Sequence, residues 1–300
     1  MEITAKMVKE LREMTGAGVM ACKNALVETD GDFDAAIEIL RKKGEATAVK
    51  KASRIAAEGT VLAVVKEDKT AAIVEVNSET DFVAQNEKFT SLLAKVGNII
   101  VNSEAKCTDC ALNIDVEGKK LSEIILEASG TIGEKLSLRR VSRVVKTDSQ
   151  VFGAYKHMGG KIVTLVLLNG NDGDAARDVA MHIAAINPKY VSKNDISAEE
   201  VSKEREILLA QALNENAEAA KPKPEAIIAK MVEGRLNKNL QEICLLNQPF
   251  VKNPDQTVEA FVKSKGCEVV SFVRLAVGEG IEKEVVDFAA EVAAQAGLNK

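Results

Sequence analysis

The feature that most constrains the fold of this chain is the order strand, turn, strand, helix, which occurs twice. In the first unit, runs rich in β-branched residues at 60–65 and 71–76 surround a polar turn at 66–69. Apolar residues at helical spacing then follow Asn86, which is a suitable helix cap. The sequence therefore predicts a β-β-α unit between residues 60 and 100.

The second unit repeats this order in the middle of the chain. Apolar runs at 151–156 and 162–168 flank a glycine pair, and a helical pattern begins near Asp174 and stops before Pro188. Two such units indicate an internal duplication of architecture in the α+β class.

The chain begins with three short helical patterns separated by glycine turns. Apolar residues recur at helical spacing within 7–14, 19–26 and 33–40. This pattern predicts a very small three-helix domain. From 41 to 54, six basic residues stand against one acid without a strong apolar period, which favours a solvated linker over a phosphate-binding patch.

A different piece follows the second unit. The segment 197–200 (SAEE) has the pattern of a capping box, and a second helical pattern follows the proline-rich segment 221–224. Two helices around a proline turn predict an antiparallel hairpin. Its heptad register is poor, because Glu204 and Gln211 fall where a seam needs apolar side chains. The hairpin could therefore pack on its own domain or on a second subunit.

The predicted fold is α+β, with an N-terminal three-helix domain, two β-β-α core subdomains and an inserted antiparallel helical hairpin. A strand at 269–277 and a helix from about Lys283 would complete the second subdomain. The expected bounds are 1–54 for the N-terminal domain with its basic linker, 55–147 for the first core subdomain, 148–196 with 241–300 for the second, and 197–240 for the hairpin.

The composition argues against nucleic acid as a direct partner. The net charge is −5 at pH 7 and 3% of the residues are aromatic, whereas proteins that bind nucleic acid carry basic surfaces and stack bases on aromatic rings. Apolar runs stay far below the ~18 residues of a membrane span, and the first residues lack the layout of a signal peptide. We therefore expect a cytoplasmic chain without a membrane partner.

The motifs of common enzyme classes are missing from the sequence. It has no metalloprotease histidine pair, phosphate-binding loop, dinucleotide-binding glycine pattern or nucleophile elbow. His182 lies in an apolar helical run and is expected in the core, whereas His157 ends a strand before a turn and could be a contact residue. We expect no enzymatic activity, no cofactor and no nucleotide bound by the chain itself.

The five cysteines are expected to be small buried side chains with reduced thiols. Cys107 and Cys110 form the one C-x-x-C motif. A zinc site would need two further ligands at suitable spacing, and a redox pair usually opens a helix in a thioredoxin-like fold. We interpret the pair as part of a variable loop, with adventitious metal or redox chemistry as the alternative.

The segment 77–86, between the second strand and its helix, allows two interpretations. Asp81 could cap a turn while Phe82 folds back onto the core. Alternatively, a phenylalanine beside an acid in a connecting loop could be presented to a partner by the rigid scaffold.

Several separated segments resemble, in order, the signatures of the bacterial elongation factor Ts family. They are residues 11–23 (LREMTGAGVMACK), 80–86 (TDFVAQN), 155–161 (YKHMGGK), 231–235 (MVEGR) and 278–283 (GEGIEK). The resemblance covers essentially the whole chain. It implies a guanine nucleotide exchange factor for elongation factor Tu, with an N-terminal domain like the ubiquitin-associated domain.

The resemblance also implies which residues make contact with Tu. One group would enter the nucleotide domain of Tu·GDP, disturb its Mg²⁺ site and release GDP, after which GTP would displace the factor: Thr80, Asp81, Phe82 and Val83. The resemblance assigns a second contact to Arg12, Val19 and Met20 and a core contact to His157. A homodimer or a 2:2 complex with Tu is left open. The alternative is an adaptor that binds another protein through its N-terminal helices.

Overall fold

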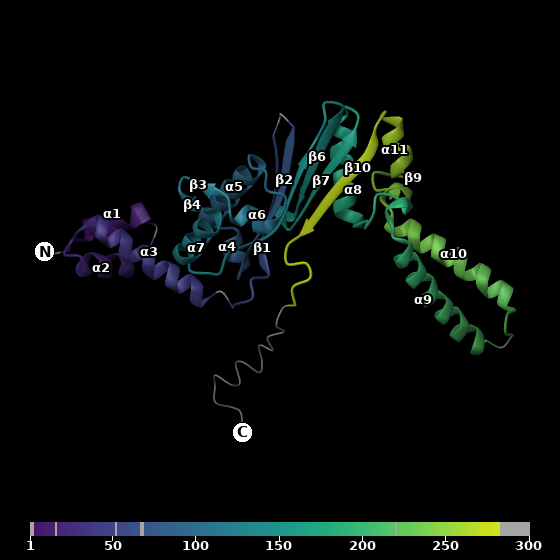
Figure 1. Ribbon diagram of the computed structural model, residues 1–300, viewed down its shortest axis with the longest axis horizontal. Helices are drawn as coiled ribbons and strands as arrows, with labels where there is room; N and C mark the ends of the chain where they lie inside the picture. Colours follow the sequence, from purple (N-terminus) through teal and green to yellow (C-terminus); the bar gives the residue numbers. More distant parts are fainter. Residues whose placement is uncertain (1–2, 16, 52, 67–68, 220, 283–300) are drawn as a thin grey trace, which may run out of the picture.

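The fold is described by a computed structural model that covers residues 3–15, 17–51, 53–66, 69–219 and 221–282. Strands and helices alternate through the middle of the chain, between a helical domain at one end and a helical hairpin at the other (Figure 1). The α+β class is therefore confirmed. Within the described ranges, no helix combines the length and the apolar character needed to cross a membrane.

The first sheet has three antiparallel strands in the order β1-β2-β5. They are β1 (Glu58–Val65), β2 (Thr70–Ser78) and β5 (Ser137–Val145). The first two strands confirm the predicted runs, and the turn predicted between them includes residues 67 and 68, which lie outside the described part. β5 was missed because three arginines break its apolar pattern.

Helices cover one face of this sheet. They lie in order between β2 and β5, together with a two-residue strand pair: α4 (Asp81–Ala84), α5 (Glu87–Val101), α6 (Thr108–Leu112), β3 (Asp115–Val116), β4 (Lys119–Lys120) and α7 (Leu121–Ile132). The predicted cap of α5 is confirmed, since the Asn86 side chain accepts a hydrogen bond from the Lys88 N–H at 2.9 Å.

The second sheet has the order β10-β7-β6 and is also antiparallel. Its elements are β6 (Gln150–His157), the 3-10 turn η1 (Met158–Gly160), β7 (Ile162–Asn169), α8 (Gly173–Ile186) and β10 (Glu268–Ala276). These confirm the second predicted unit and the last strand. The helix predicted from Lys283 lies outside the described residues.

Shorter elements join the second sheet to the hairpin. They are η2 (Lys193–Asp195), η3 (Leu245–Asn247), β8 (Pro249–Phe250), β9 (Asn253–Thr257) and α11 (Val258–Ser264). With α8, α11 packs against the outer face of the second sheet and buries Phe261 there.

The two sheets pack face to face between their own helices. On β2, Val74 points to α5 and α7, whereas Ile73 points to the second sheet. On β7, Val166 points to α8 and Leu165 to the first sheet. Successive side chains of a strand point to opposite faces, so both central strands are buried on both sides. This explains why their sequences are mostly apolar, apart from the buried Glu75 on β2 and Thr164 on β7.

The N-terminal helices form a small core of their own. They are α1 (Ala5–Thr15), α2 (Val19–Glu28) and α3 (Phe33–Lys50), and they bury Leu11 and Leu26 between them. The predicted solvated linker from residue 41 is wrong as far as Lys50, because α3 continues through it and packs along α7. The contact between α3 and α7 is made through a glycine and an ion pair. Neither produces a helical period of apolar residues in the sequence.

The inserted hairpin consists of α9 (Ala198–Ala217) and α10 (Glu225–Ile243) and projects from the body of the molecule (Figure 1). Its own two helices fill its apolar seam, with Leu208 and Val232 buried there. Ser197 caps α9, as predicted, by accepting the Glu200 N–H at 3.2 Å. The Glu200 carboxylate instead accepts the Tyr190 hydroxyl, so the reciprocal half of the capping box is not formed.

Candidate partner-binding surface

The segment with Phe82 forms one turn of helix, α4, at the end of the first sheet. Thr80, and not Asp81, caps this turn, because its hydroxyl oxygen accepts the Val83 N–H at 3.4 Å. Ala84 is buried and Val83 packs against the core, so Asp81 and Phe82 point outward. Phe82 is 84% exposed, and the interpretation that it folds back onto the core is therefore wrong.

A carboxylate from the end of α7 holds the start of this turn. Glu134 accepts the Thr80 N–H at 3.0 Å and the Thr80 hydroxyl at 2.6 Å. The Ser78 hydroxyl donates to the Thr80 carbonyl at 2.8 Å. Both polar groups of the Thr80 backbone are thus bonded to side chains, and Phe82 projects from a braced turn rather than from a free loop.

The carboxylate of Glu79, just before this turn, is held by hydrogen bonds from two sides. It accepts the Lys135 N–H at 2.7 Å and the Arg54 guanidinium at 3.0 Å. Partial burial by itself would raise the pKa of Glu79, but these two hydrogen bonds and the charges of Arg54 and Lys51 outweigh burial and lower the pKa below its ordinary value. Glu79 is therefore ionised in the fold at neutral pH.

The basic residues after α3 belong to this network. The Lys51 ammonium group donates to the Gly133 carbonyl, and the Lys135 ammonium group donates to the Arg54 carbonyl at 2.7 Å. The segment around Lys51 and Arg54 therefore joins the end of α7 to the loop before Phe82. No local pattern predicts this network, because its members come from three distant segments.

The turn after β6 lies beside the Phe82 turn. Gly160 has φ of +104°, and a Cβ there would lie 2.6 Å from Thr60 Cγ2, so this close approach requires glycine. Thr60 also donates from its hydroxyl to the Ala84 carbonyl at 3.4 Å. Thr60 on β1 thus contacts both turns, and the structure brings together two segments that are some seventy residues apart in the sequence.

The tip of the β6 turn is exposed. His157 lies at the surface with its ring stacked 6.0 Å from that of Tyr155, and Met158 is 70% exposed. Met158 was not among the predicted site residues, although its place between His157 and the glycine pair was an available signal. We define the candidate surface as Asp81, Phe82, His157 and Met158.

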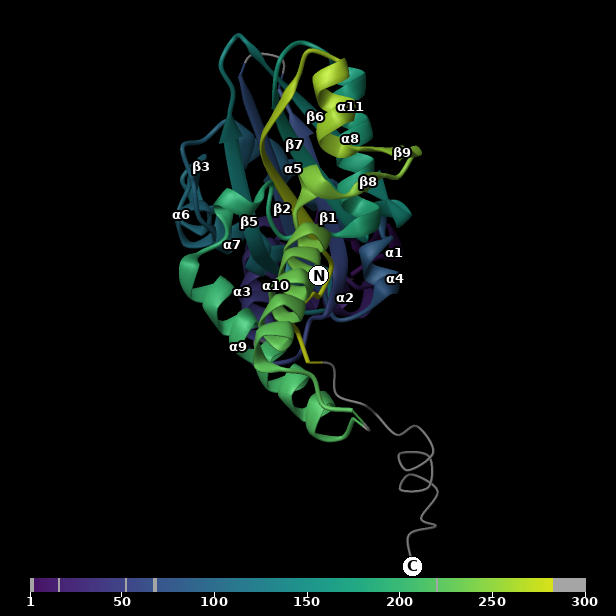
Figure 2. The same ribbon diagram turned by 90° about the vertical axis from the view of Figure 1, so that its right-hand side faces the viewer.

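The predicted N-terminal contact residues lie in a separate place. Arg12 and Val19 line a pocket of about 310 Å³ between α1 and α2, and Met20 is 65% exposed nearby. These residues belong to the three-helix domain at the end of the molecule (Figure 1), and they are not in the candidate surface. Figure 2 shows α1, α2 and α4 on the same side of the molecule.

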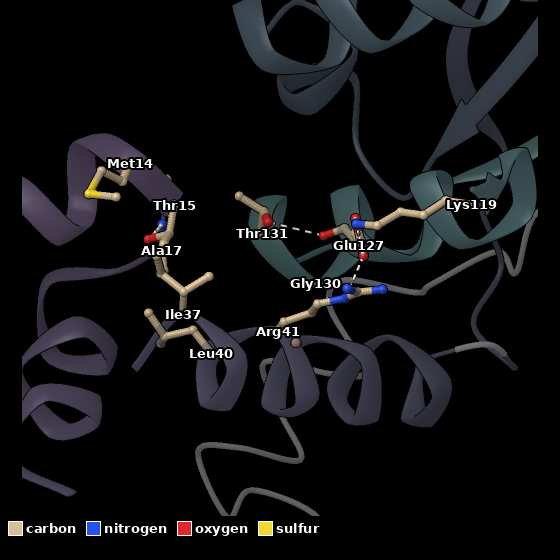
Figure 3. A pocket seen from close by; sticks show the side chains of 11 residues that line it. Met14, Thr15, Ala17, Ile37, Leu40, Arg41, Lys119, Glu127, Gly130 and Thr131 are labelled. Carbon is tan, nitrogen blue, oxygen red and sulfur yellow. Dashed lines mark hydrogen bonds and ion pairs between the residues drawn. The ribbon is translucent and has the colours of Figure 1, made fainter. Parts of the chain in front are cut away.

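The contact between α3 and α7 positions the three-helix domain on the core (Figure 3). Glu127 of α7 lies between two cations and binds Arg41 at 2.7 Å and Lys119 at 2.8 Å. The helices cross at Gly44 and Gly130, where a Cβ on Gly130 would lie 2.7 Å from the Gly44 backbone. A pocket of about 300 Å³ beside this crossing has Leu40 in its wall.

The buried histidine and the cysteines lie away from the candidate surface. His182 is fully buried; its Nδ1 accepts the Val251 N–H at 3.1 Å, and its Nε2 pairs with the Gln248 side-chain oxygen at 2.9 Å. The expectation of a core histidine is confirmed. Cys107 and Cys110 are exposed and form a disulfide, so the expectation that all five cysteines are buried and reduced is wrong.

The segments that form the candidate surface lie in a part of the chain that matches a known protein family. The family described as elongation factor TS matches residues 79–279 of this chain. The chain belongs to the elongation factor Ts family. It is therefore an elongation factor of protein biosynthesis, and its family implies a role in nucleotide exchange on elongation factor Tu. The elongation factor Ts match includes both turns of the candidate surface and begins after the three N-terminal helices.

Proposed function

We propose that this chain is the guanine nucleotide exchange factor of elongation factor Tu and that the turn 80–83 acts on the Mg²⁺ and nucleotide site of Tu. The observation that carries the proposal is the 84% exposure of Phe82 on a turn that Glu134 braces. An exposed aromatic side chain on a rigid support is typical of a contact residue that a partner buries.

The energetics favour Phe82 as the anchor. Full burial of a phenylalanine side chain contributes about 1.5–3 kcal/mol. Little of this is offset by ordering the loop, because the hydrogen bonds from Thr80 to Glu134 already fix the turn. Thr80 and Val83 support the turn, whereas Asp81 and Phe82 make the contact.

Asp81 brings the chemistry that disturbs the metal site. A Mg²⁺ ion holds a nucleotide by binding its phosphate oxygens in near-ideal octahedral geometry. When the Phe82 ring and the Asp81 carboxylate shift the ligands of this ion, the nucleotide binds more weakly. The factor itself holds no nucleotide in this mechanism, and it makes and breaks no covalent bond.

Linkage gives the exchange cycle. If the factor binds nucleotide-free Tu more tightly than Tu·GDP, it must lower the affinity of Tu for GDP by the same factor. GTP then displaces the factor in turn. Exchange is faster, while the equilibrium between the GDP and GTP forms of Tu is unchanged.

Arg12, Val19 and Met20 are proposed as a second contact with Tu. Support comes from their exposure and from the shared side of α1, α2 and α4 in Figure 2. The alternative is that these helices bind a different protein as an adaptor, since they have a core of their own. A triple alanine variant of the full chain distinguishes the two: a lower exchange rate supports the second contact, and an unchanged rate supports the adaptor.

The domain division follows the same proposal. We assign 1–54 to a domain like the ubiquitin-associated domain, 55–147 and 148–196 with 241–300 to the two core subdomains, and 197–240 to the hairpin. Separate cores in the three-helix part, on each sheet and in the hairpin support this division. We propose that the chain acts in the cytoplasm, alone or as a dimer in a 2:2 complex with Tu.

The decisive experiment measures release of a fluorescent GDP from Tu at increasing concentrations of the factor. Phe82→Ala is expected to lower the stimulated rate about 10- to 100-fold, since 1.4 kcal/mol corresponds to ~10-fold. The double variant Asp81→Ala, Phe82→Ala should lose more. Val145→Ala is the matched control, because Val145 is another exposed apolar residue of the same subdomain. Unchanged release with the double variant would refute the site.

A further inference from the structure

The exposed disulfide between Cys107 and Cys110 is separate from the proposed contact with Tu. All five cysteines lie in the described residues; Cys22, Cys244 and Cys267 are free and buried, whereas the bonded pair is exposed. Cys107 caps α6 and Cys110 lies on it, and Figure 2 shows α6 on the side opposite α4. Among the cysteines, all of which lie in the described residues, a reagent in solution therefore reaches only these two sulfurs in the folded chain.

The segments on both sides of the disulfide are anchored to the protein. Ala105 and Ala111 are buried in the core of the first subdomain. The Thr108 hydroxyl between the cysteines donates to the Arg139 carbonyl of β5 at 3.3 Å. The Cα atoms of the two cysteines are 5.2 Å apart. If the bond opens, these anchors keep the thiols close, so they can form the same bond again.

The environments of the two sulfurs differ. Cys107 Sγ accepts the backbone N–H of Cys110 at 3.1 Å, and none of the described contacts gives Cys110 Sγ a comparable donor. A hydrogen bond to a thiolate favours the charged form. Cys107 is therefore the better leaving group when the bond opens. It is also the better stabilised thiolate of the pair afterwards.

We propose that Cys107 and Cys110 form a thiol–disulfide exchange site whose co-reactant is a thiol reductant such as glutathione or a protein dithiol. In reduction, the thiolate of the reductant attacks Cys110 Sγ, the bond between the two sulfurs breaks, and Cys107 leaves as the thiolate. A second thiolate then attacks the mixed disulfide at the sulfur of the reductant and releases Cys110.

This exchange is balanced in atoms and electrons. The pair takes up two electrons and two protons, while two thiols of the reductant become one disulfide. In the reverse direction, the Cys110 thiolate attacks the oxidised partner and forms the same mixed disulfide, and the Cys107 thiolate then attacks Cys110 Sγ and releases the partner as a thiolate. The site needs no metal ion and no residue of the surface around Phe82.

A thiol titration of the full chain tests the proposal. The folded protein is equilibrated in glutathione buffers from oxidised to reduced, treated with a maleimide and weighed intact. We expect a transition from no label to two labels, with peptide mapping to Cys107 and Cys110 and no label on Cys22, Cys244 or Cys267. Free thiols at 107 and 110 in the oxidised buffer, or a pair that excess reduced glutathione leaves closed, would overturn the proposal.

Single variants test the roles of the two sulfurs. Cys110→Ser leaves Cys107 alone, and Cys107→Ser leaves Cys110 alone; serine at 107 also caps a helix. At neutral pH we expect iodoacetamide to alkylate Cys107 about five- to tenfold faster than Cys110, because of its larger thiolate fraction. Equal or reversed rates would overturn the assignment of Cys107 as the nucleophile. Exchange on Tu should stay at the wild-type rate in both variants.

Discussion

The carboxylate of Glu75 accepts a hydrogen bond from the backbone N–H of Gly278 at 2.9 Å, although the two residues are 203 positions apart. Glu75 lies on β2 of the first sheet, and Gly278 follows β10 of the second. The guanidinium groups of Arg139 and Arg140 bind the same carboxylate, and Glu75 has no exposed surface. A buried acid on the central strand of the first sheet thus joins the two sheets.

Loss of this acid should destabilise the whole core. Removal of one member of a buried ion cluster leaves uncompensated charges and costs about 3–5 kcal/mol. We therefore expect Glu75→Ala to lower the free energy of unfolding by this amount in urea titrations. Glu268→Ala is the matched control, because Glu268 is an exposed glutamate on a strand of the second sheet and its loss should cost less than about 1 kcal/mol. Similar losses in both variants would contradict the role of Glu75.

The crossing of α3 and α7 should tolerate a methyl group on one helix and not on the other. A Cβ on Gly130 would lie 2.7 Å from the Gly44 backbone, whereas a Cβ on Gly44 would lie 3.7 Å from Gly130. Gly130→Ala should therefore separate the helices and cost about 1–3 kcal/mol. Gly44→Ala should be neutral or stabilise by up to about 1 kcal/mol, since alanine favours helix.

Thermal unfolding and small-angle scattering measure both effects. If the three-helix domain detaches from the core in Gly130→Ala, the radius of gyration increases, while Gly44→Ala keeps the wild-type value. Equal behaviour of the two alanine variants would show that the helices do not cross at these glycines.

The Thr80 cap should be needed to hold Phe82 in place. Thr80→Ala removes both the acceptor for the Val83 N–H and the hydroxyl donor to Glu134, at a cost of about 0.5–2 kcal/mol. We expect faster amide hydrogen exchange at Val83 and a lower rate of stimulated GDP release. Thr80→Ser keeps the hydroxyl and should behave like the wild type. A Thr80→Ala variant with normal protection and normal release would refute this role.

His182 should make the stability depend on pH near neutrality. Burial lowers the pKa of His182, and the hydrogen bond to Gln248 offsets this only in part. The folded state therefore favours the neutral ring, whose Nδ1 accepts the Val251 N–H. Stability from this residue is complete above the ordinary histidine pKa of ~6.5 and is lost as the pH falls through the lower pKa of the folded state.

Urea unfolding at about pH 7.5 and about pH 5.5 measures this effect on either side of the ordinary histidine pKa of ~6.5. The wild type should be less stable at the lower pH. His182→Gln should lose most of this difference, whereas His157→Gln should keep it, because His157 lies at the surface. A difference that persists in His182→Gln would assign the pH dependence to other groups.

The local sequence pattern is enough to predict those strands and helix caps whose own residues show the pattern. The strands β1, β2, β6 and β7 follow from short apolar runs, and the caps of α5 and α9 follow from Asn86 and Ser197. These features depend on neighbours in the sequence, so the periods of 2 and 3.6 residues identify them directly. The ordered motifs likewise indicate the family without any knowledge of the fold.

Only the tertiary structure decided how distant residues meet. Arg139 and Arg140 obscured β5 in the sequence, because their acid partner, Glu75, comes from another strand. The extension of α3 depends on Gly44, whose contact is a second glycine on α7. The outward direction of Phe82 depends on Glu134, which braces the turn from the far end of α7. Contacts between residues so far apart in the chain leave no periodic trace, so the sequence determined the elements and the tertiary structure determined the surface.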